Sequence, residues 1–151
     1  MNLGLKGKVA LVTGGSDGIG KAAALSLAQE GAKIAICARR PELLELAASD
    51  IRNVTGVEVL SWPTDVTRPD ELSALFDKVM SGFGRIDILV NNAGTSSGGS
   101  FVSQSDEVWQ DDLDLKLFAA IRCSRMVIPH MKSRGEGRII NITAIGGKTP
   151  D

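Results

Sequence analysis

A glycine-dense turn, TGGSDGIG at residues 13–20, lies near the start of the chain between an apolar run and a helix-compatible segment. Residues 9–12 before it read as a buried strand, and residues 21–30 after it are rich in alanine and leucine, which favour a helix. A strand, a tight turn and a helix in this order bring free backbone N–H groups and the positive end of a helix dipole to one point. Such a point suits a bound pyrophosphate, so the segment predicts a nucleotide site.

The glycines of this turn have separate physical roles. We expect Gly14 and Gly15 to supply the positive φ of a tight turn, and Gly18 to let a phosphate approach the backbone. Gly20 is expected to remove a Cβ where helix and strand pack closely. The other turn residues assigned to the same cofactor site are Ser16, Asp17 and Ile19. An ordinary glycine-rich loop is the alternative. The clear strand pattern before the turn and the clear helix pattern after it argue against this alternative.

Short apolar runs alternate with helix-compatible segments along the rest of the chain. Expected strands cover residues 33–38, 57–61, 86–90 and 138–142, and expected helices cover residues 41–54, 69–83 and 106–131. This alternation implies right-handed crossovers and a parallel sheet with helices on both faces. We therefore predict a single α/β domain over residues 1–151, with a Rossmann-like, doubly wound parallel sheet of about five strands.

Composition and charge narrow the class of protein. With 151 residues and 43% hydrophobic content the chain can bury a core of its own. A net charge of -1 and the absence of a basic run argue against nucleic acid or an anionic membrane as a partner. Cys37 and Cys123 have neither a disulfide nor a metal-ligand spacing, so we expect reduced packing residues and no metal site. The start of the chain lacks a secretory pattern, and a cytoplasmic location is expected.

Several further motifs follow the glycine turn in a recognisable order. They are Asp65-Val66 after the third expected strand, Asn91-Asn92-Ala93-Gly94 after the fourth, and residues 137–141 in the fifth. With them the chain resembles the short-chain dehydrogenase/reductase family over residues 5–147. The resemblance implies that Asp65 and Val66 border the adenine of a dinucleotide. It also implies that Asn92, Ala93 and Gly94 lie along the adenine ribose and stabilise the central sheet. Taken alone, the second motif could be a strand-end turn.

Charge at the end of the second expected strand points to the choice of cofactor. A chain that prefers NAD usually carries a carboxylate about 20 residues past the glycine turn, where it accepts hydrogen bonds from the ribose 2′-OH. Here that place holds Ala38, Arg39 and Arg40. Two guanidinium groups could hold a 2′-phosphate in bidentate fashion, which predicts NADP(H). A solvated loop is the alternative for the two arginines.

The chain departs from the family where the chemistry is expected. The resemblance implies a tyrosine proton donor, a lysine four residues later, a serine that holds the substrate oxygen and an asparagine that fixes a water. The sequence contains no tyrosine, and it ends at Asp151, before the place where the tyrosine and lysine are expected. Ala144 stands at the expected serine position and Lys116 at the expected asparagine position. The candidate catalytic residues within the chain are therefore Lys116 and Thr143, the neighbour of Ala144.

Two functions remain open at this point. The first is an NADP(H)-dependent oxidoreductase that transfers a hydride between nicotinamide and a small-molecule carbonyl or alcohol. The second is a catalytically impaired nucleotide-binding protein of the same fold, acting as a sensor or oligomerisation partner. The complete glycine site and the mostly enzymatic family favour the oxidoreductase. We expect the chain to be the N-terminal part of a longer domain, to be inactive by itself, and to form a homo-oligomer when the protein is full length.

Overall fold

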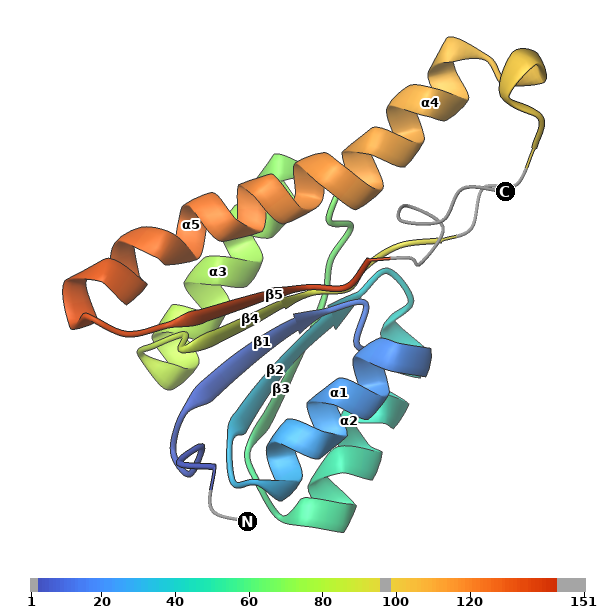
Figure 1. Ribbon diagram of the computed structural model, residues 1–151. Helices are drawn as coiled ribbons and strands as arrows, with labels where there is room; N and C mark the ends of the chain where they lie inside the picture. The colour runs from blue at the N-terminus through green and yellow to red at the C-terminus, as the bar shows by residue number, and fades with distance from the viewer. Residues whose placement is uncertain (1–2, 96–98, 144–151) are drawn as a thin grey trace.

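The structure, a computed structural model, describes residues 3–95 and 99–143. Five strands form one parallel sheet in the order β3-β2-β1-β4-β5 (Figure 1). The strands are β1 (Val9–Thr13), β2 (Lys33–Ala38), β3 (Val59–Pro63), β4 (Ile88–Asn91) and β5 (Arg138–Asn141). The helices are α1 (Gly18–Gln29), α2 (Pro41–Thr55), α3 (Pro69–Phe83), η1 (Phe101–Ser103), α4 (Asp106–Leu113), η2 (Asp114–Phe118) and α5 (Ala119–Arg134). The predicted α/β class and doubly wound, Rossmann-like sheet are confirmed.

Two apolar layers hold helices against the two faces of the sheet. α1 and α2 cover one face, and α3 and α5 cover the other (Figure 1). Side chains alternate along β1, so Ala10 and Val12 belong to the cluster under α1 and α2, while Val9 and Leu11 belong to the cluster under α3 and α5. A strand buried on both faces reads as a continuous apolar run, as residues 9–12 do.

The order in which strands are added to the sheet changes direction at β1. β1 pairs with β2 on one side and with β4 on the other, so the connections after these strands diverge to opposite faces. In open α/β sheets a crevice forms at such a switch point, outside the carboxyl ends of the strands. This topology brings the glycine turn after β1 next to the Asn91-Asn92-Ala93-Gly94 segment after β4.

A buried carboxylate joins the amino ends of β1 and β4, at the edge of the sheet opposite the crevice. Asp87 is only 4% exposed, and its Oδ2 accepts a hydrogen bond of 2.8 Å from the Val9 backbone N–H. Its Oδ1 lies 2.6 Å from Nη2 of Arg85 and 3.1 Å from Nη2 of Arg134. Burial alone would raise the pKa of Asp87, but the hydrogen bonds and charges of these neighbours hold it below its ordinary value. One side chain thus connects β1, the start of β4 and the end of α5.

The long helix expected over residues 106–131 is present, but it contains a π turn that was not expected and it ends three residues later. The structure has α4, then the π-helical turn η2, then α5, which ends at Arg134. In η2 the Ala119 N–H donates to the Asp114 carbonyl five residues back, so this turn contains one residue more than an α-helical turn. Such a turn rotates the side chains that follow it relative to those before it.

Other boundaries differ by a few residues. β3 runs from Val59 to Pro63 and not over residues 57–61, because an edge strand tolerates a proline that cannot donate to a further partner. α1 begins at Gly18 and not at Lys21, because Asp17 caps the helix inside the glycine turn. β4 begins at Ile88, two residues later than expected. Within the part of the chain that the structure describes, no helix is long and apolar enough to cross a membrane.

Candidate functional site

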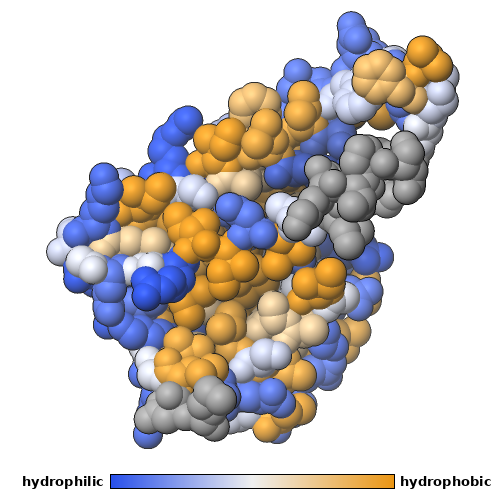
Figure 2. Space-filling view, viewed as in Figure 1, coloured by the Kyte–Doolittle hydropathy of each residue, from blue (hydrophilic) through white to orange (hydrophobic). Residues whose placement is uncertain are grey.

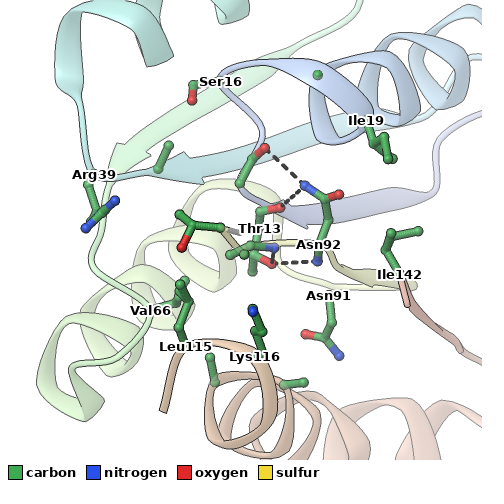
Figure 3. A pocket seen from close by; sticks show the side chains of 18 of the residues that line it. Thr13, Ser16, Ile19, Arg39, Val66, Asn91, Asn92, Leu115, Lys116 and Ile142 are labelled. Carbon is green, nitrogen blue, oxygen red and sulfur yellow. Dashed lines mark hydrogen bonds between the residues drawn. The ribbon is translucent and has the colours of Figure 1, made fainter. Parts of the chain in front are cut away.

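A cavity of about 820 Å³ opens at the carboxyl ends of the strands, at the switch point of the sheet (Figure 3). Its walls come from the glycine turn, the end of β2, the turn after β3, the end of β4, and the face of η2 and α5. Arg39 lies on one side of the cavity, across from Ile19 and Ile142 (Figure 3). The cavity therefore has a cationic end and an apolar end.

The glycine turn forms the upper wall of the cavity in Figure 3. Gly14 has φ +67°, and Gly18 has φ +53° with no protein atom within 4 Å of an added Cβ. Most of the turn residues assigned from the sequence line the cavity: Gly14, Ser16, Asp17, Gly18 and Ile19. The backbone around Gly18 is therefore open to a group in the cavity.

Gly15 does not have the expected positive φ and is not in the cavity lining. Its N–H donates to the Cys37 carbonyl at 3.1 Å, which prolongs the pairing of β1 with β2. An added Cβ would lie 2.6 Å from Cγ2 of Ile36, so this glycine is needed for close packing. The close packing expected at Gly20 is confirmed, because a Cβ there would lie 2.2 Å from the Gly14 carbonyl oxygen.

Asp17 occupies the amino end of α1. Its Oδ1 accepts a hydrogen bond of 2.7 Å from the Gly18 N–H, as a helix N-cap does. The carboxylate marks the position that an anion takes at a helix N-terminus. A phosphate in this cavity would compete with Asp17 for the same backbone donor.

Hydrogen bonds between Thr13 and Asn92 join the ends of β1 and β4 (Figure 3). Nδ2 of Asn92 donates to the carbonyls of Thr13 and Gly14 at 3.1 and 3.2 Å. Oγ1 of Thr13 accepts from the backbone N–H groups of Asn92 and Ala93, both at 3.0 Å. Asn92, Ala93 and Gly94 all line the cavity, and these bonds hold their segment against the glycine turn.

The two arginines lie where the sequence predicts them, at the end of β2. Arg39 and Arg40 are exposed and line the cavity. Val66 lines it too, but Asp65 does not. Oδ1 of Asp65 accepts hydrogen bonds from the N–H and Oγ1 of Thr67, at 3.0 and 2.7 Å. Burial would raise the pKa of Asp65, but these bonds and the charge of Arg39 hold it below its ordinary value.

Of the two candidate catalytic residues, Lys116 lies on the other side of the cavity from α1 (Figure 3). Lys116 belongs to η2, and its Nζ lies 2.7 Å from Oδ1 of Asp112. Figure 3 shows its side chain directed into the cavity, toward Thr13 and Asn92. Thr143, two residues after the end of β5, lines the cavity, whereas Ala144 lies outside the described residues.

Sequence reasoning missed a wall of small side chains on α5. Ala119, Ala120 and Cys123 line the cavity together with Leu115. The spacing of Leu115, Ala119 and Cys123 by four residues, which places them on one helix face, is a signal that could have revealed this wall. Burial raises the pKa of Cys123 to about 11, so its thiol is uncharged at neutral pH. The remaining lining residues that were not assigned to the site are Thr13, Ala38, Thr64, Asn91, Thr95 and Ile142.

The two cysteines are free and buried. Among residues 3–95 and 99–143, no group of three or more His, Cys, Asp or Glu side chains gathers as a metal site. The cavity therefore offers backbone donors, two guanidinium groups, an ammonium group and an apolar wall.

Comparison with known proteins agrees with this geometry. The model of the family described as short chain dehydrogenase matches residues 8–151. Nodulation protein G of a Rhizobium species is 41% identical over 145 residues, which make up 96% of this chain and 58% of that protein.

Two solved structures share the fold over almost the whole chain. L-sorbose reductase from Gluconobacter frateurii, complexed with NADPH and L-sorbose, is 42% identical with a TM-score of 0.96 over 100% of this chain and 57% of that one. NAD+-bound xylitol dehydrogenase is 34% identical with a TM-score of 0.92, over 97% of this chain and 56% of that one. The chain thus spans little more than half the length of these relatives. From its sequence, fold and family match, the chain belongs to the short-chain dehydrogenase family.

Proposed function

We propose that the chain is the cofactor-binding part of an NADP(H)-dependent oxidoreductase that transfers a hydride between nicotinamide and a carbonyl or alcohol substrate. The observation that carries the proposal is that Arg39, Arg40 and the open backbone at Gly18 face one cavity. This set of groups fits the 2′-phosphate and the pyrophosphate of a single dinucleotide.

The cavity walls also match the remaining parts of the dinucleotide in polarity. Val66 and Leu115 line the cavity on the side of Arg39 (Figure 3), where an apolar wall suits an adenine ring. Ile19 and Ile142 lie at the far end, where the nicotinamide would be held. When bound, the nicotinamide ring supplies or accepts the hydride.

The solved relatives support the fold and the reaction class but do not decide the cofactor. The sorbose reductase is described with NADPH and the xylitol dehydrogenase with NAD+, and both share this fold closely. The choice for this chain rests on the two arginines at the end of β2. The sensor alternative gains no support from these two relatives, because both are named as oxidoreductases.

The arginine pair should set a preference for NADPH over NADH. Replacing Arg39 and Arg40 together by alanine should remove about 1–3 kcal/mol of this preference, the range for hydrogen bonds to charged groups. Calorimetric titration of the chain with both cofactors measures the preference directly. NADH is the internal control, since it lacks the 2′-phosphate and its affinity should change little. Equal affinities for the two cofactors in the unmodified chain would contradict the NADP(H) assignment.

For catalysis we propose Lys116 and Thr143 as the residues of this chain that approach the reacting groups. The Lys116 ammonium is held by Asp112, and Thr143 offers a hydroxyl donor beside the apolar end of the cavity. Neither residue replaces a positioned tyrosine as the general acid. Loss of a general acid typically lowers the rate of the chemical step by about 10²–10⁴-fold.

The 151-residue chain should therefore bind NADPH without reducing carbonyl compounds above the uncatalysed rate. NADPH absorbance followed over a panel of ketones and aldehydes measures this. Turnover by the unmodified chain would mean that the proton donor lies within it, and Lys116→Ala would then be the first variant to lose that turnover.

The proposal includes assembly into a homo-oligomer by the full-length protein. Apolar side chains gather over α5 and at the adjoining edge of the sheet (Figure 2). Exposed apolar residues of these elements are Leu117 of η2, Ile121 and Ile128 of α5, and Ile140 of β5, which are between 38% and 49% exposed. Contiguous exposed apolar surface marks an interaction site. A full-length protein that sediments as a monomer would exclude this part of the proposal.

A further inference from the structure

One arginine of α5 contacts two walls of the cavity without lining it. Nη1 of Arg122 donates to the Thr67 carbonyl at 3.1 Å, and Nη2 lies 3.4 Å from Oδ1 of Asp114. The guanidinium carbon also lies 5.6 Å from the centre of the Phe118 ring. Thr67 belongs to the turn after β3, whereas Asp114 and Phe118 are the first and last residues of η2. We infer that Arg122 is a positioning residue that holds these two cavity walls at a fixed separation.

Each of the two walls supplies side chains to the cavity. The turn after β3 contributes Thr64 and Val66, and η2 contributes Leu115 and Lys116. Under the proposed function, on which this inference rests, the apolar members of this set contact the adenine ring. A shift of either wall would therefore change the width of the adenine site, and a shift of η2 would also move Lys116.

Hydrogen bonds tie the turn after β3 to α3 on one side and to α5 on the other. On the α3 side, Oε2 of Glu71 accepts a hydrogen bond of 2.7 Å from the Asp65 N–H. Within the turn, the Asp65 carboxylate accepts from Thr67. On the α5 side, the Thr67 carbonyl accepts from Arg122. Removing the guanidinium would thus leave the turn bonded to α3 and remove its hydrogen bond to α5, so that only the apolar cluster around Val66 would hold the turn near α5.

The π-helical turn η2 also depends on contacts from outside it. A π turn is less favourable than an α turn and persists where other contacts support it. Asp114 and Phe118 lie eight and four residues before Arg122, so all three occupy one face of the helix. The ion pair to Asp114 and the contact with the Phe118 ring therefore hold both ends of η2.

Arginine suits this position better than lysine. Its planar fork presents donors in two directions at once, whereas an ammonium on a flexible stem is a point charge. The side chains of Arg122 and Asp114 are 27% and 30% exposed, so their ion pair adds little to the free energy of unfolding. We therefore expect the effect of Arg122 on cavity geometry to exceed its effect on stability.

The test compares Arg122→Met and Arg122→Lys with Arg125→Met as the matched control. Arg125 lies on the same helix and is exposed, and its side chain makes no hydrogen bond or ion pair with the described residues. Calorimetry measures the dissociation constants of the full chain for NADPH and for adenosine 2′,5′-bisphosphate, which carries only the adenine half. Thermal unfolding of each variant is measured in parallel.

Arg122→Met should weaken the binding of both ligands by about tenfold, because the two walls would no longer be held at the separation that fits the adenine ring. Arg122→Lys should recover part of the affinity, and Arg125→Met should bind like the unmodified chain. A purely structural role would lower the melting temperature of Arg122→Met and leave its affinity well below that temperature unchanged. That result would overturn the inference.

Two outcomes separate this inference from the proposed function. An unmodified chain that binds neither ligand would contradict the proposed function itself. An unmodified chain that binds both, with Arg122→Met binding equally well, would overturn only the positioning role. If Arg122→Met does not fold, Arg122→Lys decides: weakened binding at an unchanged melting temperature supports the role, and unchanged binding refutes it.

Discussion

Gly18→Val should lower the affinity of the chain for NADPH by about 100-fold or more, because two or more charge-assisted hydrogen bonds to the pyrophosphate would be lost. Gly18 lines the cavity at the amino end of α1, and no protein atom lies within 4 Å of an added Cβ. A valine side chain would therefore take up open space beside the backbone donors. Calorimetry with NADPH measures the loss, and circular dichroism reports whether the fold persists.

Gly56→Val is the matched control for backbone strain. Gly56 has φ +73° and, like Gly18, no atom within 4 Å of an added Cβ, but it caps the carboxyl end of α2 and does not line the cavity. In each variant the valine in the left-handed backbone region lowers the free energy of unfolding by about 1–3 kcal/mol. If both variants are folded and bind NADPH equally well, the pyrophosphate does not lie at this turn.

Asp87→Ala should lower the free energy of unfolding by about 1.5–3 kcal/mol, the range for a hydrogen bond to a charged group, because the arginines that remain are partly exposed. The variant leaves the Val9 N–H and the guanidinium groups of Arg85 and Arg134 without their shared acceptor. Urea unfolding followed by circular dichroism measures the change. Glu136→Ala is the control, because Glu136 contacts Arg85 in the same cluster from an exposed position and should contribute little. Equal stabilities of Asp87→Ala and the unmodified chain would contradict the role of Asp87.

The same carboxylate gives stability a pH dependence with a definite sign. The pKa of Asp87 is lowered in the folded chain, so its contribution is complete above the unfolded-state pKa of about 3.9. The contribution is lost as the pH falls from there through the folded-state pKa. The unmodified chain should therefore lose more stability than Asp87→Ala over this acid range.

Much of the fold could be predicted because most elements carry their own local signal. β2 and α3 have the predicted bounds: the first is apolar after its initial lysine, and the second begins with a proline and ends before a glycine. The π turn could not be predicted in this way. Asp114 and Phe118 are ordinary helix residues, and under our inference the wider turn is held by Arg122, which also bonds to the distant Thr67 carbonyl.

The candidate site was partly predictable for the same reason. The turn residues and the arginines follow strands directly, so the sequence order alone places them at one edge of the sheet. Gly15 and Asp65 lie outside the lining because their partners, Ile36 and Thr67, are set by packing and by a local hydrogen-bonded turn. No periodic pattern in the sequence indicates either of these two contacts.

The position of β1 in the middle of the sheet has a consequence for how the chain folds. β1 can pair with β2 through a short connection, but the bond from the Val9 N–H to Asp87 joins residues 78 apart. Closing so long a loop costs entropy before its contacts form, so β4 is expected to join β1 late. The cavity exists only once these two strands meet, and its ligand must therefore bind the fully folded chain. By mass action, such a ligand would stabilise the last step of folding above all others.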